Sequence, residues 1–208
     1  MPRTIAIGDI HGSSQALASL LNAINPEPND VLITLGDYVD RGIDSKGVLD
    51  TLIDLSKRCR LISILGNHDE MMLRARESRS AFAEWMEFGG ISTLASYGES
   101  EHIDLIPEKH FEFLGSCLPF FETETHFFTH ANYESDKPLN QQTGQTLRWL
   151  SLLDNLPGPH VSGKVAVVGH TPQKEVLDLG HLVCIDTESG GRLTAVEIGA
   201  DRMWSVSR

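Results

Sequence analysis

Five short apolar runs in this sequence are each followed at once by a cluster that contains His, Asp or Asn. The runs are rich in β-branched and aromatic residues, which is typical of buried strands. They cover residues 4–8, 31–35, 61–65, 127–129 and 165–169. In open α/β sheets, ligands bind beyond the carboxyl ends of the strands. The repetition therefore predicts that the five clusters meet in one crevice.

The segments between the first three runs carry apolar residues at helical spacing. One helix is expected to begin at Ser13 or Ser14 and to stop before Pro26, because proline cannot continue it. A second helix has its apolar side over residues 48–55. The alternation of strand and helix over residues 4–65 predicts two βαβ units with parallel strands.

The remainder of the chain predicts two further regions. Residues 69–125 indicate a mostly helical excursion over one face of the sheet, broken at Gly89-Gly90. Near the end, strands are expected over 182–186, 193–198 and 202–206, joined by turns at 188–191 and 199–201 as an antiparallel addition. The fold class expected is α/β, a sandwich of two mixed β-sheets flanked by helices. Its 208 residues suit a single domain, 1–208.

Composition narrows the classes of partner. The chain has 17 Lys and Arg against 29 Asp and Glu, a formal net charge of −12, which disfavours nucleic acid and anionic membranes. No apolar stretch approaches the roughly 20 residues of a membrane span, and no signal-peptide pattern is present. Three distant cysteines favour a reducing compartment. We therefore expect a cytoplasmic protein, with no prediction of its oligomeric state.

The clusters after the strands supply a mixed set of oxygen and nitrogen donors without thiolate. The set consists of Asp9, His11, Asp37, Asn67, His130 and His170. Such donors suit divalent ions such as Mn, Fe or Zn, and six of them suit two ions that share a carboxylate. Each cluster alone has an ordinary alternative, such as a turn, a surface ion pair or a core histidine. Their repetition favours a dinuclear metal site.

The polar blocks resemble the signature of a known family. GDIHG at 8–12, GDYVDRG at 36–42 and GNHD at 66–69, then His130 and GHT at 169–171, are similar to the phosphoprotein phosphatase (PPP) family of calcineurin-like metallophosphoesterases. The order and spacing match across nearly the whole chain. Further positions resemble the bacterial and phage serine/threonine phosphatase branch, namely Trp85, Gly89-Gly90, residues 93–94, 96–98, 106–107 and 185–187. The resemblance implies a metallophosphoesterase-type sandwich.

The resemblance also implies a role for each matching residue. The first three donors would bind one ion and the last three a second, with Asp37 shared between them. A hydroxide held by two divalent ions, most simply manganese, would attack phosphorus in line. His68 would protonate the leaving group while Asp40 orients its ring. Arg41 and Asn67 would contact the phosphoryl oxygens.

Three positions depart from the family pattern. Bacterial relatives usually carry Trp-x-Arg, whose Arg is a second phosphate ligand, whereas residues 148–151 here read Arg-Trp-Leu-Ser. Arg148 is therefore either a replacement phosphate ligand or a surface charge. Asn132 replaces a glycine and is either a substrate contact or a helix cap or turn residue. Glu188 also stands where relatives often have glycine, and is expected to alter only a turn.

The function expected is a metal-dependent phosphomonoesterase acting on phosphoserine or phosphothreonine in proteins, since residues 39–42 resemble that branch. The alternative is a symmetrical dinucleoside-polyphosphate hydrolase or another small-molecule phosphatase, because those relatives share the metal blocks. A non-catalytic module is disfavoured because the donors and His68 are all present, and a nuclease because no basic stripe is present. Trp85, Phe88 and Tyr97 are either substrate contacts or, as their helical spacing favours, core residues.

Overall fold

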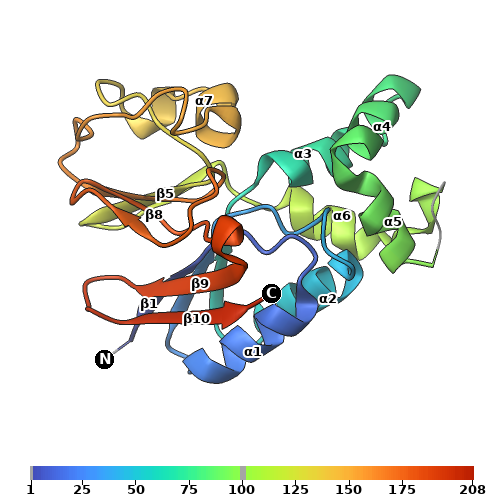
Figure 1. The fold of residues 1–208 in the computed structure, drawn as a ribbon, viewed down its shortest axis with the longest axis horizontal. Coiled ribbons are helices and arrows are strands. Elements are labelled where there is room, and N and C mark those ends of the chain that lie inside the picture. The colour runs from blue at the N-terminus through green and yellow to red at the C-terminus, as the bar shows by residue number, and fades with distance from the viewer. Residues whose placement is uncertain (1, 99–101) are drawn as a thin grey trace.

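Two five-stranded sheets face each other in the computed structural model, which describes residues 2–98 and 102–208 (Figure 1). The first sheet contains, in spatial order, β10 (Met203–Ser207), β9 (Arg192–Glu197), β1 (Thr4–Ile7), β2 (Val31–Thr34) and β3 (Arg60–Ser63). The second contains β4 (Phe120–Glu122), β5 (His126–Thr129), β6 (Val165–Val168), β8 (Leu182–Cys184) and β7 (Leu177–Asp178). Each sheet is mixed, so the predicted sandwich of two mixed sheets is confirmed.

The first three strands are parallel, as the two βαβ units predict. Their connecting helices, α1 (Ser14–Ile24) and α2 (Ser45–Leu55), lie on the outer face of the first sheet, where they bury their apolar sides (Figure 1). α1 stops where expected, because Asn25 takes a left-handed conformation with φ of 48°. Ser13 is the N-cap residue of this helix, but its hydroxyl makes no capping hydrogen bond.

The predicted helical excursion is present, although residues 99–101 within it lie outside the described residues. It contains α3 (Asn67–Arg74), α4 (Arg79–Trp85), η1 (Met86–Gly90), α5 (Ile91–Ser96), η2 (Ile103–Leu105) and α6 (Glu108–Gly115). The predicted break is confirmed at Gly89, whose φ of 122° kinks the helix before α5 continues it. Trp85, Leu94 and Leu114 share one apolar core with α1 and α2, so the excursion packs on the same core as these helices.

The C-terminal region corrects the prediction of one antiparallel addition. β8 pairs in parallel with β6 in the second sheet, whereas β9 lies antiparallel to β1 in the first. The segment between them, which contains η4 (Glu188–Gly190), is therefore a crossover between sheets and not a hairpin turn. Short strand spacing alone does not distinguish these two connections, and that is why the prediction was wrong. α7 (Gly144–Trp149) lies over the outer side of the second sheet (Figure 1), and Leu139 of η3 (Leu139–Gln141) belongs to the apolar core of this sheet.

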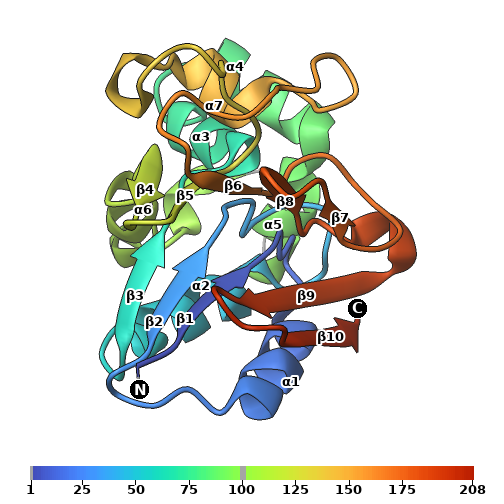
Figure 2. The ribbon, with the colours of Figure 1, turned by 90° about the vertical axis from the view of Figure 1, so that its left-hand side faces the viewer.

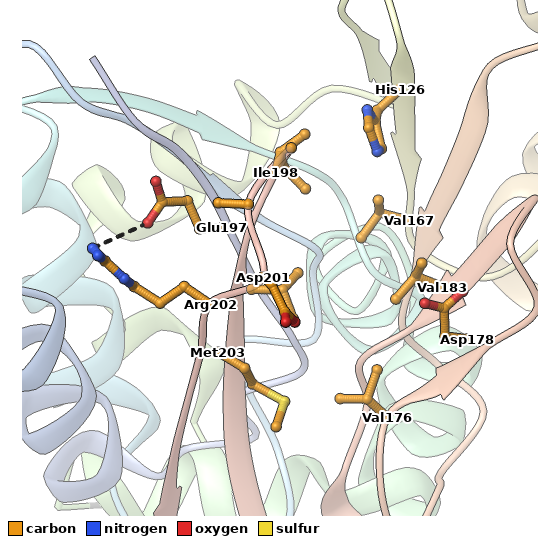
Figure 3. A pocket seen from close by; sticks show the side chains of 13 residues that line it. His126, Val167, Val176, Asp178, Val183, Glu197, Ile198, Asp201, Arg202 and Met203 are labelled. Carbon is orange, nitrogen blue, oxygen red and sulfur yellow. Dashed lines mark ion pairs between the residues drawn. The ribbon is translucent and has the colours of Figure 1, made fainter. Parts of the chain in front are cut away.

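The space between the sheets is filled at its centre and open at one end. Ala6, Ile33, Phe128 and Val167 belong to the apolar core between the sheets. Where β5 begins and β9 ends, the sheets part around a cleft of about 290 Å³ with valine walls and a polar rim (Figure 3). The hydrogen bond from Ile198 N–H to the carbonyl of Thr4 puts this cleft at the amino end of β1. The predicted clusters lie at the opposite, carboxyl end.

Among the described residues, no helix combines the length and apolar character needed to cross a membrane.

Candidate metal centre and active site

The loops that follow the parallel strands converge between the two sheets (Figure 2). Two groups of donor atoms gather there, and within each group the atoms lie within 4.8 Å of one another. One group is His11, Asp37 and His68, and the other is Asp37, His130 and His170. Asp37 belongs to both groups, which is the arrangement that two ions sharing a carboxylate require.

The remaining two predicted donors lie beside these groups. Asn67 Oδ1 is 3.0 Å from both His130 Nε2 and His170 Nδ1. The Asp9 carboxylate accepts a hydrogen bond from the main-chain N–H of His170 at 3.1 Å. The structure thus brings all six predicted donors together, although they come from five separate segments of the chain.

The three predicted histidine ligands are oriented in the same way, because one ring N–H of each donates a hydrogen bond to a main-chain carbonyl. The carbonyls are those of Val39 for His11 (2.9 Å), Leu35 for His130 (2.7 Å) and Trp149 for His170 (3.2 Å). Such a bond fixes the tautomer and leaves the other ring nitrogen free to bind a metal. In each ring that other nitrogen is the one that faces the donor cluster. The donor set therefore fits a cation pair.

The buried titratable groups of the cluster strongly shift one another's pKa values. Burial raises the pKa of Asp9 well above its usual range, and nearby Asp186 adds to this effect. Burial opposes ionisation of Asp37, but His130 and other imidazoles outweigh it and hold its pKa well below normal. The same Asp37 charge overcomes burial at His130 and raises its pKa to about 10. A buried carboxylate whose charge favours a cationic neighbour in this way indicates a site suited to positive charge.

Two glycines of the motifs are needed because other atoms approach them closely. A Cβ atom on Gly66 would lie 2.2 Å from Asp37 Oδ1, and one on Gly169 would lie 2.1 Å from Asp9 Oδ1. Any side chain at either position would collide with a predicted metal-binding carboxylate. The motif glycines therefore allow close packing at these two positions.

Backbone strain is concentrated in the same loops. Six non-glycine residues among those described have positive φ, and all but Asn25 belong to the predicted clusters. These five are His11 (43°), Asp37 (51°), Asp40 (70°), Arg41 (63°) and His170 (64°). Left-handed conformations cost energy and persist at functional sites because their surroundings hold them.

The buried carboxylate of Asp69 is one of the groups that holds this backbone. It accepts hydrogen bonds from the main-chain N–H groups of Asp37 at 2.8 Å, Tyr38 at 2.9 Å and Gly66 at 3.0 Å. Asp69 thereby ties the loop after β2 to the loop after β3. Sequence reasoning did not assign this role, although the residue completes the GNHD block that it used.

The predicted acid, His68, is held by a buried partner. His68 Nδ1 donates to Asp40 Oδ2 at 2.8 Å, and this carboxylate also accepts from Trp85 Nε1 at 3.0 Å and Thr93 Oγ1 at 2.7 Å. Burial would lower the pKa of His68, but Asp37 and Asp40 outweigh it and raise the pKa. The helical excursion therefore supplies two hydrogen-bond donors, Trp85 and Thr93, that fix the Asp40 carboxylate. Sequence reasoning missed this role for both residues.

The other aromatic residues that were considered as substrate contacts have different surroundings. Tyr97 makes a hydrogen bond of 2.6 Å with His110, and Phe88 is about half exposed. Trp85 is fully buried. Only Phe88 of the three therefore presents a large surface to solvent.

The two predicted phosphate-binding arginines are both paired with glutamates. Arg41 Nη1 donates to Glu188 Oε2 at 2.6 Å, so Glu188 does more than alter a turn. Arg148 Nη2 donates to Glu70 Oε1 at 2.7 Å, and Trp149 Nε1 donates to the other oxygen of Glu70. Arg148 is thus mostly buried and paired, and a role in phosphate binding stays a prediction.

Asn132 is buried, and its side chain bonds to the main chain. Its Nδ2 donates to the carbonyl of Asn155 at 2.8 Å, and its Oδ1 accepts from Tyr133 N–H at 2.7 Å. These bonds give Asn132 a structural role in holding the segment that follows α7.

The site and its motifs define a class of protein. Residues 2–193 match the family model of calcineurin-like phosphoesterases, and the chain belongs to this family. It is therefore a phosphatase, a hydrolase of a family that uses a dinuclear divalent metal centre, and the His and Asp clusters fit such a centre.

Among curated relatives, serine/threonine-protein phosphatase 1 of Salmonella typhimurium is 29% identical over 207 residues, covering 92% of this chain and 90% of the relative. Serine/threonine-protein phosphatase 2 of Escherichia coli is 36% identical over 107 residues, or 50% of this chain and 47% of the relative. The symmetrical bis(5′-nucleosyl)-tetraphosphatase of Proteus mirabilis is 44% identical over 71 residues, or 34% and 25%.

Solved structures confirm the fold class. A crystal structure of a candidate diadenosine tetraphosphatase covers 100% of this chain and 96% of its own, with a TM-score of 0.76 and 22% identity. The cold-active protein-tyrosine phosphatase of a psychrophilic Shewanella covers 100% and 78%, with a TM-score of 0.74 and 16% identity. At these identities the likeness concerns the fold alone.

Proposed function

We propose that this protein is a metal-dependent phosphomonoesterase that removes phosphate from phosphoserine and phosphothreonine in proteins, in the cytoplasm. The observation that carries the proposal is the shared position of Asp37 in two donor groups, with the His68–Asp40 pair beside them. This combination supports a role for the cluster in which the ions hold the nucleophile and His68 donates the proton. We propose manganese as the metal, because oxygen and imidazole donors suit it, with iron or zinc as alternatives.

Six residues would hold the two ions. They are Asp9, His11, Asp37, Asn67, His130 and His170. When bound, a pair of divalent ions supplies Lewis-acid polarisation and lowers the pKa of water towards about 7. The carbonyl bonds of the three histidines keep the ring nitrogens aimed at the ions, so the cluster needs little rearrangement to bind them.

His68 would donate a proton to the departing alkoxide from Nε2. Its other nitrogen is held by Asp40, which keeps the ring oriented and stabilises its protonated form. An alkoxide is a poor leaving group, so such an acid contributes about 10²–10⁴-fold to the rate. Trp85 and Thr93 support this arrangement by fixing the Asp40 carboxylate.

Arg41 would bind the phosphoryl oxygens, because a guanidinium matches the geometry of phosphate. Asn67 would contribute its amide to the same group. Arg148 would act as a second clamp only if its bond to Glu70 opened, and its buried Nε has no hydrogen-bond partner among the described residues.

Hydrolysis of symmetrical dinucleoside polyphosphates is the second candidate. It is favoured by the 44% identity to a tetraphosphatase, which is restricted to 71 residues. The protein phosphatase relative extends instead over 92% of this chain, and this supports the first candidate. Both candidates use the same donors, so the metal centre does not distinguish them.

The test is a comparison of substrates on one preparation. We expect about two ions per chain in the purified protein, phosphate release from a phosphoserine peptide with added manganese, and loss of activity on chelation. Diadenosine tetraphosphate is the second substrate. Turnover of the nucleotide without turnover of the peptide would contradict the protein phosphatase proposal, and activity that survives chelation would contradict the metal mechanism.

A further inference from the structure

The side chain of Arg41 lies between a carboxylate and the proposed acid. Its Nη1 donates to Glu188 Oε2 at 2.6 Å, and its Nη2 lies 3.3 Å from His68 Nε2. The side chains of Arg41 and Glu188 are 46% and 26% exposed, so the pair lies partly open to solvent beside His68. The guanidinium is therefore shared between the acid and a residue that is 147 positions away in the sequence.

The turn that carries Glu188 is firmly placed. The main-chain N–H of Glu188 donates to Asp186 Oδ1 at 3.0 Å. Ile185, which precedes Asp186, packs against the end of β1. A Cβ atom on Gly8 would lie 2.5 Å from the carbonyl oxygen of Ile185. A Cβ atom on Gly190 would likewise lie 2.2 Å from the carbonyl oxygen of Lys174. These contacts fix the turn relative to the loop that carries Asp9.

We propose that Glu188 is a positioning and specificity residue for the phosphoryl group bound by Arg41. Its carboxylate holds the guanidinium over the site and also places one negative charge beside the bound group. This inference rests on the proposed function, because it takes the donor cluster to hold a phosphoryl group through its ions. The positioning acts through Arg41, whereas the charge acts directly on the substrate.

The charge has a different effect on different substrates. Coulomb repulsion grows with the number of charges that a substrate brings near Glu188. A phosphomonoester brings one dianionic group, whereas a dinucleoside tetraphosphate brings a chain of charged phosphates. Glu188 therefore favours monoesters over polyphosphates, which is the distinction that the metal donors do not make.

Two substitutions at this position separate the two effects. Glu188→Gln removes the charge but keeps an amide oxygen that accepts a hydrogen bond from Arg41. Glu188→Ala removes both. The matched control is Glu108→Gln, which removes the same charge from an exposed pair with Arg76, at 2.9 Å, within the helical excursion. Each manganese-loaded variant is compared with wild type for binding of inorganic phosphate by calorimetry, and for kcat and KM on a phosphopeptide and on diadenosine tetraphosphate.

We expect Glu188→Gln to bind inorganic phosphate about 3- to 10-fold more tightly and to shift the kcat/KM ratio towards the tetraphosphate by about 5-fold or more. Glu188→Ala should lower kcat about 10-fold on either substrate, because Arg41 is no longer held, and Glu188→Gln should restore it. Glu108→Gln should match wild type.

Wild-type phosphate affinity and an unchanged substrate ratio in Glu188→Gln would overturn the specificity role. Equal kcat values in Glu188→Ala and wild type would overturn the positioning role. If no phosphopeptide is hydrolysed, the proposed function fails, but phosphate binding by Glu188→Gln still decides the role of Glu188. The two failures are therefore distinguishable.

Discussion

The carboxyl and amino ends of the parallel strands are built from different kinds of interaction. At the carboxyl end, His11, Asp37 and His170 adopt left-handed backbone conformations around buried titratable groups. At the amino end, the main features are an ordinary ion pair between Arg3 and Asp30 and the valine-lined cleft. Left-handed backbone and coupled buried charges are thus concentrated at the end that gathers the donors, whereas the buried Asp30 at the other end is paired with Arg3. Substitutions at the two ends should therefore have separable effects on activity and on stability.

The largest effect is expected for Asp37→Asn at the carboxyl end. The shared carboxylate would be lost, so the protein should lose bound metal and its phosphatase activity should fall on the order of 10³-fold. Metal analysis and phosphate release measure the two effects. Asp201→Asn, in the exposed turn beside the amino-end cleft, is the matched control and should retain both. Full metal content and activity in Asp37→Asn would show that the carboxyl end does not hold the metal through this carboxylate, and would contradict the contrast drawn between the two ends.

A smaller but still large effect is expected for His68→Asn. Loss of the proton donor should lower kcat on alkyl phosphates by about 10²–10⁴-fold while metal content stays near that of wild type. An aryl phosphate, whose leaving group is more stable as an anion, should be affected much less. Equal losses on the two kinds of substrate would argue against His68 as the acid.

Trp85→Phe tests whether the helical excursion acts on the site through Asp40. The substitution keeps an aromatic ring but removes the Nε1 donor, so kcat should fall about 10-fold, since a bond to a charged group is worth about 1.5–3 kcal/mol. KM should change little. Trp204→Phe in β10 is the control, because this residue packs on the apolar core far along the chain from Asp40. Similar kinetics in the two variants would contradict the positioning role of Trp85.

The smallest effect on activity is expected for Asp30→Asn at the amino end. Hydrogen bonds from Arg3 lower the pKa of Asp30 to about 2, below its usual value of 3.8. A lowered pKa means that the ionised pair stabilises the fold above about pH 4, and that this contribution is lost as the pH falls towards 2. The variant should lose about 1 kcal/mol at pH 7, or about 2–4 °C in Tm.

Thermal unfolding as a function of pH measures the difference between Asp30→Asn and wild type. That difference should shrink as the pH falls from 4 to 2, while metal content and kcat at pH 7 remain unchanged. A constant difference in Tm across this range would show that the Asp30 charge is not responsible.

The donors could be predicted from the sequence because each one follows a recognisable strand. His130 and His170 are the clearest cases, since an isolated histidine gives no signal and only the repeated position after an apolar run identified them. The parallel order of β1, β2 and β3 followed in the same way from helices between the strands. Each donor lies directly after its strand in the sequence, so its position can be predicted without knowledge of the three-dimensional fold.

The supporting contacts could not be predicted, because they join segments that are distant in the sequence. Trp85 and Thr93 reach Asp40 from a different region of the chain, and Glu188 reaches Arg41 across 147 positions. The parallel pairing of β8 was missed for a related reason. Its short connection to β9 is compatible with a hairpin, and only its neighbours in three dimensions exclude one. Whether the chain is a single domain stays a prediction.

The position of β9 between β1 and β10 has a consequence for synthesis on the ribosome. Ile5 pairs with Glu197, so one edge of β1 lacks its neighbour until almost all of the described chain has emerged. Unpaired strand edges in a nascent polypeptide promote aggregation. His170 also emerges late, so the completed sheet and the completed donor cluster arise at nearly the same stage of translation. Premature termination before residue 192 should therefore yield aggregated rather than partly active protein.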